Sequence, residues 1–196
     1  MRGRSLSHRV GAMSVGFWGV RAPVLRRLVI GLALFTATAV QATPLAPEPR
    51  KPIDPERYLG RWYEIARVPN ALQDRCEGAT SDWSKARDGQ YDVVQTCHIG
   101  SPSGPAKVWK GAAHMIAPSK IRIGFFGGFV HQDYWVIDRG DDYSWSIMGT
   151  PDPRYVWIMS RRAVLSPQQK AALVARTRAL GYDTAALVYD QQSPSA

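Results

Sequence analysis

The stretch GRWYEIAR, residues 60–67, decides the fold and opens the part of the chain that can form a buried core. A glycine stands two positions before Trp62, and Tyr58-Leu59 precedes the stretch. Side chains on a strand alternate between two faces, so Trp62, Glu64 and Ala66 are predicted to share one face. The stretch is therefore predicted to be the first strand of the domain.

Seven further runs rich in aromatic and β-branched residues follow this strand, with turn residues between them. Short strands with this regular spacing are typical of an all-β sandwich or barrel. Asp88-Gly89 separates the second run from the third and is a favoured hairpin turn, because glycine tolerates positive φ. The predicted strands cover residues 59–67, 79–86, 91–98, 106–115, 120–126, 132–138, 143–149 and 154–161.

The periodicity changes after these runs. Ser166-Pro167 is typical of a helix start, and Gly181 is a stop signal. An apolar stripe between them predicts an amphipathic helix on the outer wall of the sheet; it consists of Ala171, Leu173, Val174, Ala175 and Leu180. Residues 185–189 predict a last short strand.

Three segments resemble the signatures of the lipocalins and follow one another in that family's order. GRW at residues 60–62 resembles the first signature, DDY at 141–143 lies near the second, and YVWIMSR at 155–161 resembles the third. The resemblance covers about residues 54–191 and is strongest to the bacterial lipocalins of the Blc outer-membrane lipoprotein group, with apolipoprotein D and the temperature-induced lipocalins as relatives. It implies an all-β fold, an eight-stranded antiparallel up-and-down barrel with a C-terminal α-helix.

The resemblance also implies a barrel-closing motif. In the family, the residue at the position of Gly60 starts the first strand, the residue matching Trp62 plugs the closed end, and the residue matching Arg161 stacks over that tryptophan.

An eight-stranded barrel has room for one small ligand, and alternation together with the family pattern indicates which side chains face it. The candidate ligand-binding residues are Glu64, Trp109, Ile123, Phe125, Tyr134, Val136, Tyr155, Trp157 and Met159. This set is mostly apolar, with a few polar groups at the ends of side chains, which suits a ligand with a hydrocarbon part and a polar head. Glu64 is expected to pair with an inward Arg or Tyr, since buried charges are usually paired; the alternative is that it meets the ligand's head. A barrel filled by its own side chains is the alternative to a cavity.

The two cysteines of the chain are Cys76 and Cys97. A hairpin that turns at Asp88-Gly89 brings them together only if a bulge corrects the register. We expect a disulfide in an oxidising compartment. The alternative is a free thiol nucleophile, as in prostaglandin D synthase, an enzymatic lipocalin.

Other catalytic and metal-binding signals are weak. His98, His114 and His131 form no i,i+4 pair and have no Cys-x-x-Cys companion, so no metal site is expected. The sequence lacks a nucleophile elbow, a phosphate-binding glycine loop and a dinucleotide fingerprint, so neither a cofactor nor catalysis is expected. FFGGF at residues 125–129 joins two strands and is interpreted as a flexible apolar lip or a dimer surface. Peripheral contact with a membrane is a separate partner hypothesis, alongside a homodimer.

Charge and hydropathy divide the chain near residue 42. Six of its 25 basic residues and none of its 16 acidic ones precede residue 43, so the remainder carries a net charge of +3, which does not indicate nucleic-acid binding. Arg26-Arg27, an uncharged run at 28–39 and the small-residue end Val40-Gln41-Ala42 predict a secretory signal peptide over residues 1–42. The alternative to a cleaved signal peptide is an uncleaved membrane anchor. Met13 is an alternative start of the chain. General secretion is favoured over twin-Arg export because no serine precedes the arginine pair.

The rest of the chain is assigned by composition and resemblance. Residues 43–53 are predicted to be a flexible leader, 54–191 the domain and 192–196 a tail. No cysteine follows the predicted signal directly, so lipid anchoring is not expected. A periplasmic location is expected instead. The predicted function is binding, storage or transport of a fatty acid or lysophospholipid in the bacterial cell envelope, and the alternative is an enzyme that acts on a lipid-derived substrate through a free Cys.

Overall fold

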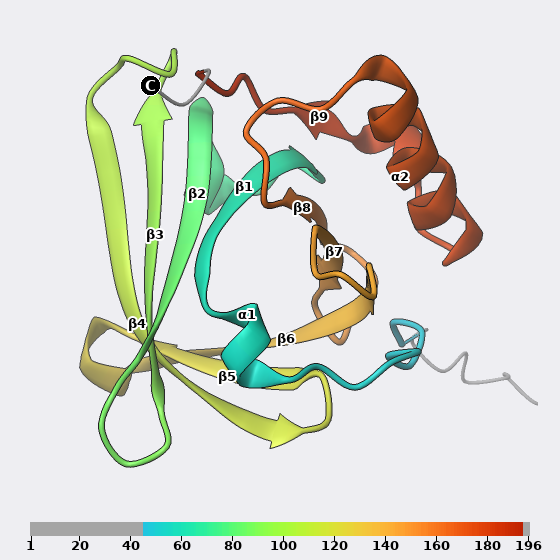
Figure 1. Ribbon diagram of the computed structural model, residues 1–196. Coiled ribbons are helices and arrows are strands. Elements are labelled where there is room, and N and C mark those ends of the chain that lie inside the picture. The colour runs from blue at the N-terminus through green and yellow to red at the C-terminus, as the bar shows by residue number, and fades with distance from the viewer. Residues whose placement is uncertain (1–44, 194–196) are drawn as a thin grey trace, which may run out of the picture. The chain divides into compact units, whose positions relative to one another are not determined.

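The computed structural model describes residues 45–193, in which eight antiparallel strands close into a barrel (Figure 1). Each strand pairs with the next along the chain, and β1 pairs with both β8 and β2, which closes the sheet. The barrel strands are β1 (Gly60–Arg67), β2 (Cys76–Lys85), β3 (Tyr91–Ile99), β4 (Ala106–Ala117), β5 (Lys120–Phe125), β6 (Val130–Arg139), β7 (Trp145–Gly149) and β8 (Val156–Ser160). The predicted fold is thus confirmed.

Turn chemistry explains where the strands begin and end. Asp88 and Gly89 both have positive φ, 62° and 74°, as the predicted tight hairpin between β2 and β3 requires. The strand predicted to begin at residue 143 begins instead at Trp145. Tyr143 has φ of 60°, and its N–H donates to the Gly140 carbonyl over 3.0 Å, so it belongs to the turn before β7.

A short helix, α1 (Pro55–Tyr58), precedes β1 and was not predicted. The Asp54 carboxylate caps it by accepting from the Glu56 N–H over 3.0 Å. Tyr58 at its end packs against Trp62 and Trp83, with ring centres 4.7 and 5.4 Å apart. These aromatic rings fill one end of the barrel, which we call the closed end.

The predicted C-terminal helix is α2 (Pro167–Ala179), and it begins with a capping box between Ser166 and Gln169. Leu173 and Leu180 are buried with Ile147 and Ile158 of the barrel wall. Figure 1 shows α2 lying beside the barrel near β9. Ala171 and Ala175 are exposed because they lie off the side of α2 that carries Leu173 and Leu180, so that part of the predicted apolar stripe is wrong.

Short elements complete the chain. Three 3-10 helices lie in loops: η1 (Ala71–Gln73), η2 (Phe126–Gly128) and η3 (Thr184–Ala186). The predicted last strand is shorter than expected: β9 (Val188–Tyr189) pairs with β1 after η3. It brings the segment at Asp190 back to the barrel wall, where the Asp190 N–H donates to the Ile65 carbonyl over 3.1 Å.

The barrel interior near the closed end is solid. Its inward side chains there are buried and packed together; they include Val93, Ala113, Ile121, Ile123 and Val136. A second apolar cluster lies between the outer wall and α2. This filled part of the barrel provides a floor for a cavity. The cavity reaches Tyr58 and Trp62 and extends to the opposite end of the barrel, which we call the mouth.

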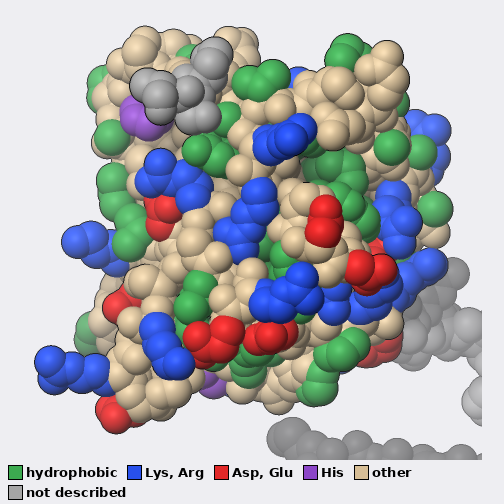
Figure 2. Space-filling view, in the orientation of Figure 1, with side chains coloured by type: hydrophobic (Ala, Val, Ile, Leu, Met, Phe, Trp, Pro, Cys, Tyr) green, Lys and Arg blue, Asp and Glu red, His purple; other side chains and the backbone are tan. Residues whose placement is uncertain are grey.

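On the face seen in Figure 2, lysine and arginine side chains are interspersed with aspartate and glutamate. Within residues 45–193, no helix has the length and apolar character needed to cross a membrane. The predicted signal peptide lies outside the described residues, as do residues 43 and 44 of the predicted leader.

Candidate functional site

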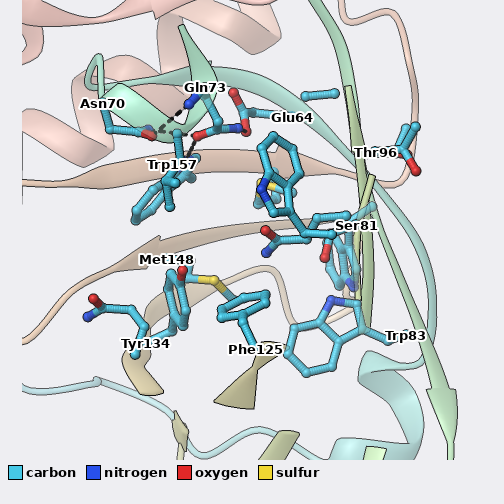
Figure 3. Close-up of a pocket in the computed structure, with 18 of the residues that line it drawn as sticks. Glu64, Asn70, Gln73, Ser81, Trp83, Thr96, Phe125, Tyr134, Met148 and Trp157 are labelled. Carbon is cyan, nitrogen blue, oxygen red and sulfur yellow. Dashed lines mark hydrogen bonds between the residues drawn. The ribbon is translucent and has the colours of Figure 1, made fainter. Parts of the chain in front are cut away.

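A cavity of about 320 Å³ lies inside the barrel, between the closed-end rings of Tyr58 and Trp62 and the mouth. This volume falls in the range of roughly 300–1,000 Å³ that is common for ligand pockets. Figure 3 shows aromatic and sulfur-containing side chains at one level of the cavity and an amide and carboxylate group at another. The lining residues are Tyr58, Trp62, Glu64, Asn70, Leu72, Gln73, Ala79, Thr80, Ser81, Trp83, Gln95, Thr96, Trp109, Phe125, Phe126, Val130, Gln132, Tyr134, Met148, Trp157 and Met159.

The bottom of the cavity is apolar. Trp83, Phe125 and Met148 face one another there above the filled part of the barrel (Figure 3). Tyr134 and Trp157, on the strands that flank Met148, contact each other with ring centres 5.7 Å apart. A hydrocarbon group that enters the cavity is therefore surrounded by aromatic and thioether side chains.

The polar side of the cavity depends on a β-bulge in β1. The pairing of β1 with β8 shifts between Glu64 and Ala66, so strict alternation fails after Glu64. Ile65 and Ala66 both pack into the outer cluster, and Arg67 turns back to the side of Glu64. The prediction that Ala66 faces inward is therefore wrong, because the bulge adds one residue to the strand.

Glu64 forms the centre of a polar network on the cavity wall. Its carboxylate accepts from Arg67 Nη1 over 2.7 Å and from Gln73 Nε2 over 2.7 Å. The Gln73 Oε1 atom in turn accepts from Trp157 Nε1 over 2.9 Å and from Asn70 Nδ2 over 2.7 Å. The dashed bonds in Figure 3 include this group. Glu64 thus has the Arg partner that the sequence led us to expect, and it lines the cavity as well.

A second buried carboxylate, Asp190, lies behind Glu64. Its Oδ1 atom is 3.6 Å from Arg67 Nη1, and its Oδ2 atom accepts from the Ala79 N–H and from Gln192 Nε2, each over 2.6 Å. Burial and then the neighbouring Glu64 carboxylate raise the pKa of Asp190 to about 8. Burial also raises the pKa of Glu64, against the lowering effect of Arg67. One guanidinium therefore serves two carboxylates.

The structure brings together most of the predicted ligand-binding residues. The six that line the cavity are Glu64, Trp109, Phe125, Tyr134, Trp157 and Met159. Ile123 and Val136 face the interior but lie in the filled part near the closed end, below the cavity. Tyr155 precedes β8, lies beside Trp157 at 6.3 Å between ring centres, and is not part of the lining.

Several lining residues were not predicted. Ser81 and Gln95 oppose each other on β2 and β3 and follow from alternation, because they are two positions from the inward-facing Trp83 and Val93. Gln73 belongs to η1 in the loop between β1 and β2, where no periodic pattern could indicate its direction.

The predicted barrel-closing residues meet at the closed end. The Arg161 guanidinium lies 3.8 Å from the Trp62 ring centre and donates to the backbone carbonyls of Arg61 and Arg57 over 2.8 and 3.0 Å. Trp62 is fully buried, and its Nε1 donates to the Tyr58 carbonyl over 2.9 Å. Gly60 has φ of 91°, and a Cβ built there would be 3.4 Å from Arg161 Nη1. A glycine at this position thus allows both the backbone conformation and the approach of the guanidinium.

Cys76 and Cys97 form the predicted disulfide, with their Cα atoms 5.4 Å apart. The register between β2 and β3 shifts between Glu77 and Thr80, where Gly78 has φ of 60°. This is the bulge that the sequence required, because without it the two side chains would point to opposite faces. Both cysteines of the chain are therefore bonded, and neither is a free thiol.

The segment 125–129 forms a bulky apolar edge beside the mouth. Phe126 and Phe129 are 64% and 91% exposed, and Phe126 also lines the cavity. Across the described part of the chain, no group of three or more His, Cys, Asp or Glu side chains is arranged to hold a metal ion.

Comparisons with known proteins agree with this architecture. A family model described as a lipocalin-like domain matches residues 53–192. The chain is 31% identical over 145 residues to the outer membrane lipoprotein Blc of Escherichia coli K12, covering 72% of this chain and 81% of that protein. It is 30% identical over 154 residues to temperature-induced lipocalin-1 of Arabidopsis thaliana, covering 73% and 81%. The structure of insecticyanin from the tobacco hornworm Manduca sexta superposes with a TM-score of 0.61 at 17% identity, covering 78% of this chain and 87% of that one.

Proposed function

Because the chain belongs to the lipocalin family, we propose that it binds, stores or transports a lipid, a fatty acid or a lysophospholipid, in the bacterial cell envelope. The observation that carries the proposal is a cavity of about 320 Å³ with an apolar floor and polar groups nearer the mouth. Each buried methylene contributes about 0.8 kcal/mol before the costs of ordering the ligand. Ten buried methylenes would thus contribute roughly 8 kcal/mol, enough for useful affinity without an ionic contact.

The proposed activity is binding and not catalysis. The competing hypothesis needs a free cysteine thiol as nucleophile, and the disulfide between Cys76 and Cys97 takes up both thiols. The cavity lining contains neither cysteine.

The proposed setting is the periplasm, reached by export with cleavage after Ala42. The basic, apolar and small-residue order of residues 26–42 supports it. N-terminal sequencing of protein from a periplasmic fraction should begin at Thr43. A chain that still begins at Met1 or Met13 and sediments with membranes would contradict the export proposal.

The binding proposal is tested with a cavity-filling variant. Ser81 is buried and lines the cavity, so Ser81→Leu places a larger side chain in the ligand's space. We expect wild-type protein to carry copurified lipid in native mass spectrometry and to bind the uncharged fluorophore N-phenyl-1-naphthylamine, and Ser81→Leu to bind both at least tenfold more weakly.

The matched control is Ser84→Leu, which makes the same exchange at an exposed position of the same strand. This variant should keep wild-type binding. If neither copurified lipid nor a displaceable fluorophore is found with wild-type protein, the proposed function is wrong.

A further inference from the structure

The charge of the cavity wall restricts the polar part of the ligand. Among the described residues that line the cavity there is one carboxylate, Glu64, and no Lys, Arg or His. Two lining tyrosines, Tyr58 and Tyr134, have pKa values raised to about 12 by burial, so they are uncharged at neutral pH. A ligand group inside the barrel therefore meets a wall whose only formal charge is negative.

The groups behind the wall do not reverse this sign. Arg67 is held by the Glu64 carboxylate and by the carbonyls of Gln73 and Cys76, over 2.7, 3.2 and 2.9 Å, and it also faces Asp190. Glu77 lies close enough to raise the pKa values of both Glu64 and Asp190. A ligand carboxylate beside Glu64 would add a further negative charge next to the carboxylates of Glu64 and Glu77, which Arg67 alone offsets, because Asp190 keeps its proton below about pH 8.

Lys107 is a cation beside the residues that line the cavity. Lys107 Nζ donates to the Leu72 carbonyl over 2.8 Å and lies 4.8 Å from the ring centre of Trp109. Its side chain is not part of the cavity lining. It could contact only a group that remains at the mouth, so it provides the competing hypothesis that an acidic head stays outside the barrel.

Neutral hydrogen-bonding groups form a row across three strands of the cavity wall. Ser81 of β2 pairs with Gln95 of β3, which pairs with Trp109 of β4, and all three line the cavity. The row lies one inward position above Trp83 and Val93, which belong to the apolar floor and the filled interior. Hydroxyl, amide and indole groups can bind hydroxyl or ester oxygens without a charge on either side.

We infer that the ligand carries an uncharged polar group, a hydroxyl or an ester, at the level of Ser81, Gln95 and Trp109, and that a free carboxylate is disfavoured inside the barrel. This inference rests on the proposed function and narrows it. Of the two lipid classes proposed above, it disfavours the free fatty acid and favours a chain joined through an alcohol or an ester.

The test compares two ligands of equal chain length on the full mature protein. Dodecan-1-ol and dodecanoic acid are each titrated at pH 7.5 against bound N-phenyl-1-naphthylamine, and each dissociation constant is obtained from the displacement. We expect the alcohol to bind at least tenfold more tightly than the ionised acid. In Glu64→Gln this ratio should fall to about threefold or less, whereas Asp92→Asn, which removes an exposed carboxylate from the outer face of β3, should keep the wild-type ratio.

The outcomes are distinguishable. If the acid binds wild-type protein as tightly as the alcohol and Lys107→Met weakens only the acid, the head lies at the mouth and the inference is wrong, although the proposed function stands. If neither compound displaces the fluorophore, the proposed function itself fails. The wild-type comparison decides the question even if Glu64→Gln does not fold.

Discussion

At the residue scale, the contact between Trp62 and Arg161 closes the barrel. Trp62→Ala should lower the free energy of unfolding by about 3–5 kcal/mol, because it removes a fully buried side chain. Arg161→Ala should lower it less, and the double variant should reveal a coupling of about 0.5–2 kcal/mol from the stacked guanidinium. Urea unfolding of the four proteins measures these values.

The adjacent arginine provides the control for this cycle. Arg162 is exposed, and Arg162→Ala should change the free energy of unfolding by less than about 0.5 kcal/mol. Strictly additive effects of Trp62→Ala and Arg161→Ala would show that the stacking contributes nothing.

Asp190 should make stability depend on pH. Its pKa is raised from 3.8 to about 8, mainly by burial, so between these values the folded protein keeps a proton that the unfolded chain releases. The stabilisation from this proton is complete below about pH 4 and is lost as the pH rises through about 8. Asp190→Asn should remove much of this loss of stability with rising pH. The measurement is the melting temperature of the variant minus that of the wild type, followed from pH 5 to 8.5.

Glu64 takes part in the same titration, since the two carboxylates share Arg67. The control is Asp92→Asn, at an exposed position, which should keep the wild-type pH dependence. A pH profile of Asp190→Asn that parallels the wild type would show that Asp190 is ionised in the folded protein across this range.

At the element scale, the disulfide joins β2 to β3 just beyond the bulge that aligns them. It links residues 21 positions apart, and in the chain-entropy model this corresponds to about 3 kcal/mol of stabilisation. The double variant Cys76→Ala/Cys97→Ala should lose about that amount in urea unfolding. Its affinity for N-phenyl-1-naphthylamine should change less than threefold, because neither cysteine lines the cavity. A parallel loss of affinity at temperatures where the variant is folded would show that the hairpin shapes the cavity.

At the scale of the whole domain, a bound ligand should stabilise the folded barrel by mass action. At a free concentration of 100 times Kd, the gain is about 2.7 kcal/mol, which corresponds to a rise in melting temperature of roughly 5–11 °C for a domain of this size. Differential scanning fluorimetry with dodecan-1-ol measures the rise. Ser84→Leu should keep the shift and Ser81→Leu should lose it; equal shifts in both variants would place the ligand outside the cavity.

The sequence predicted the elements well where local chemistry decides them. Asp88-Gly89 forms the hairpin turn, Ser166 caps α2, and the signature at 60–62 opens β1. The errors follow from features that a local pattern does not contain. The bulge after Glu64 moved Ala66 to the outer face, and a turn with positive φ at Tyr143 delayed β7.

In the candidate site, too, local patterns predicted some features correctly and missed others. Alternation along a strand indicates which face a side chain occupies, and it was correct for Ile123, Val136 and Tyr134. It does not indicate how far along the barrel axis the filled interior extends. Ile123 and Val136 therefore lie in the floor, whereas Tyr134 reaches the cavity.

The sequence by itself determined the family, the order of the strands and the position of the helix, because each depends on periodicity, turn residues or a signature that is local in the chain. Only the tertiary structure decided the height of the cavity floor, the packing of Gln73 against Glu64 and Trp157, and the placement of Asp190 beside Arg67. Asp190 lies more than 100 positions after Arg67 in the chain, and β9 brings it there by pairing with β1. The ionisation of such a group depends on its burial and on its neighbours in space, and these exist only once the barrel has closed.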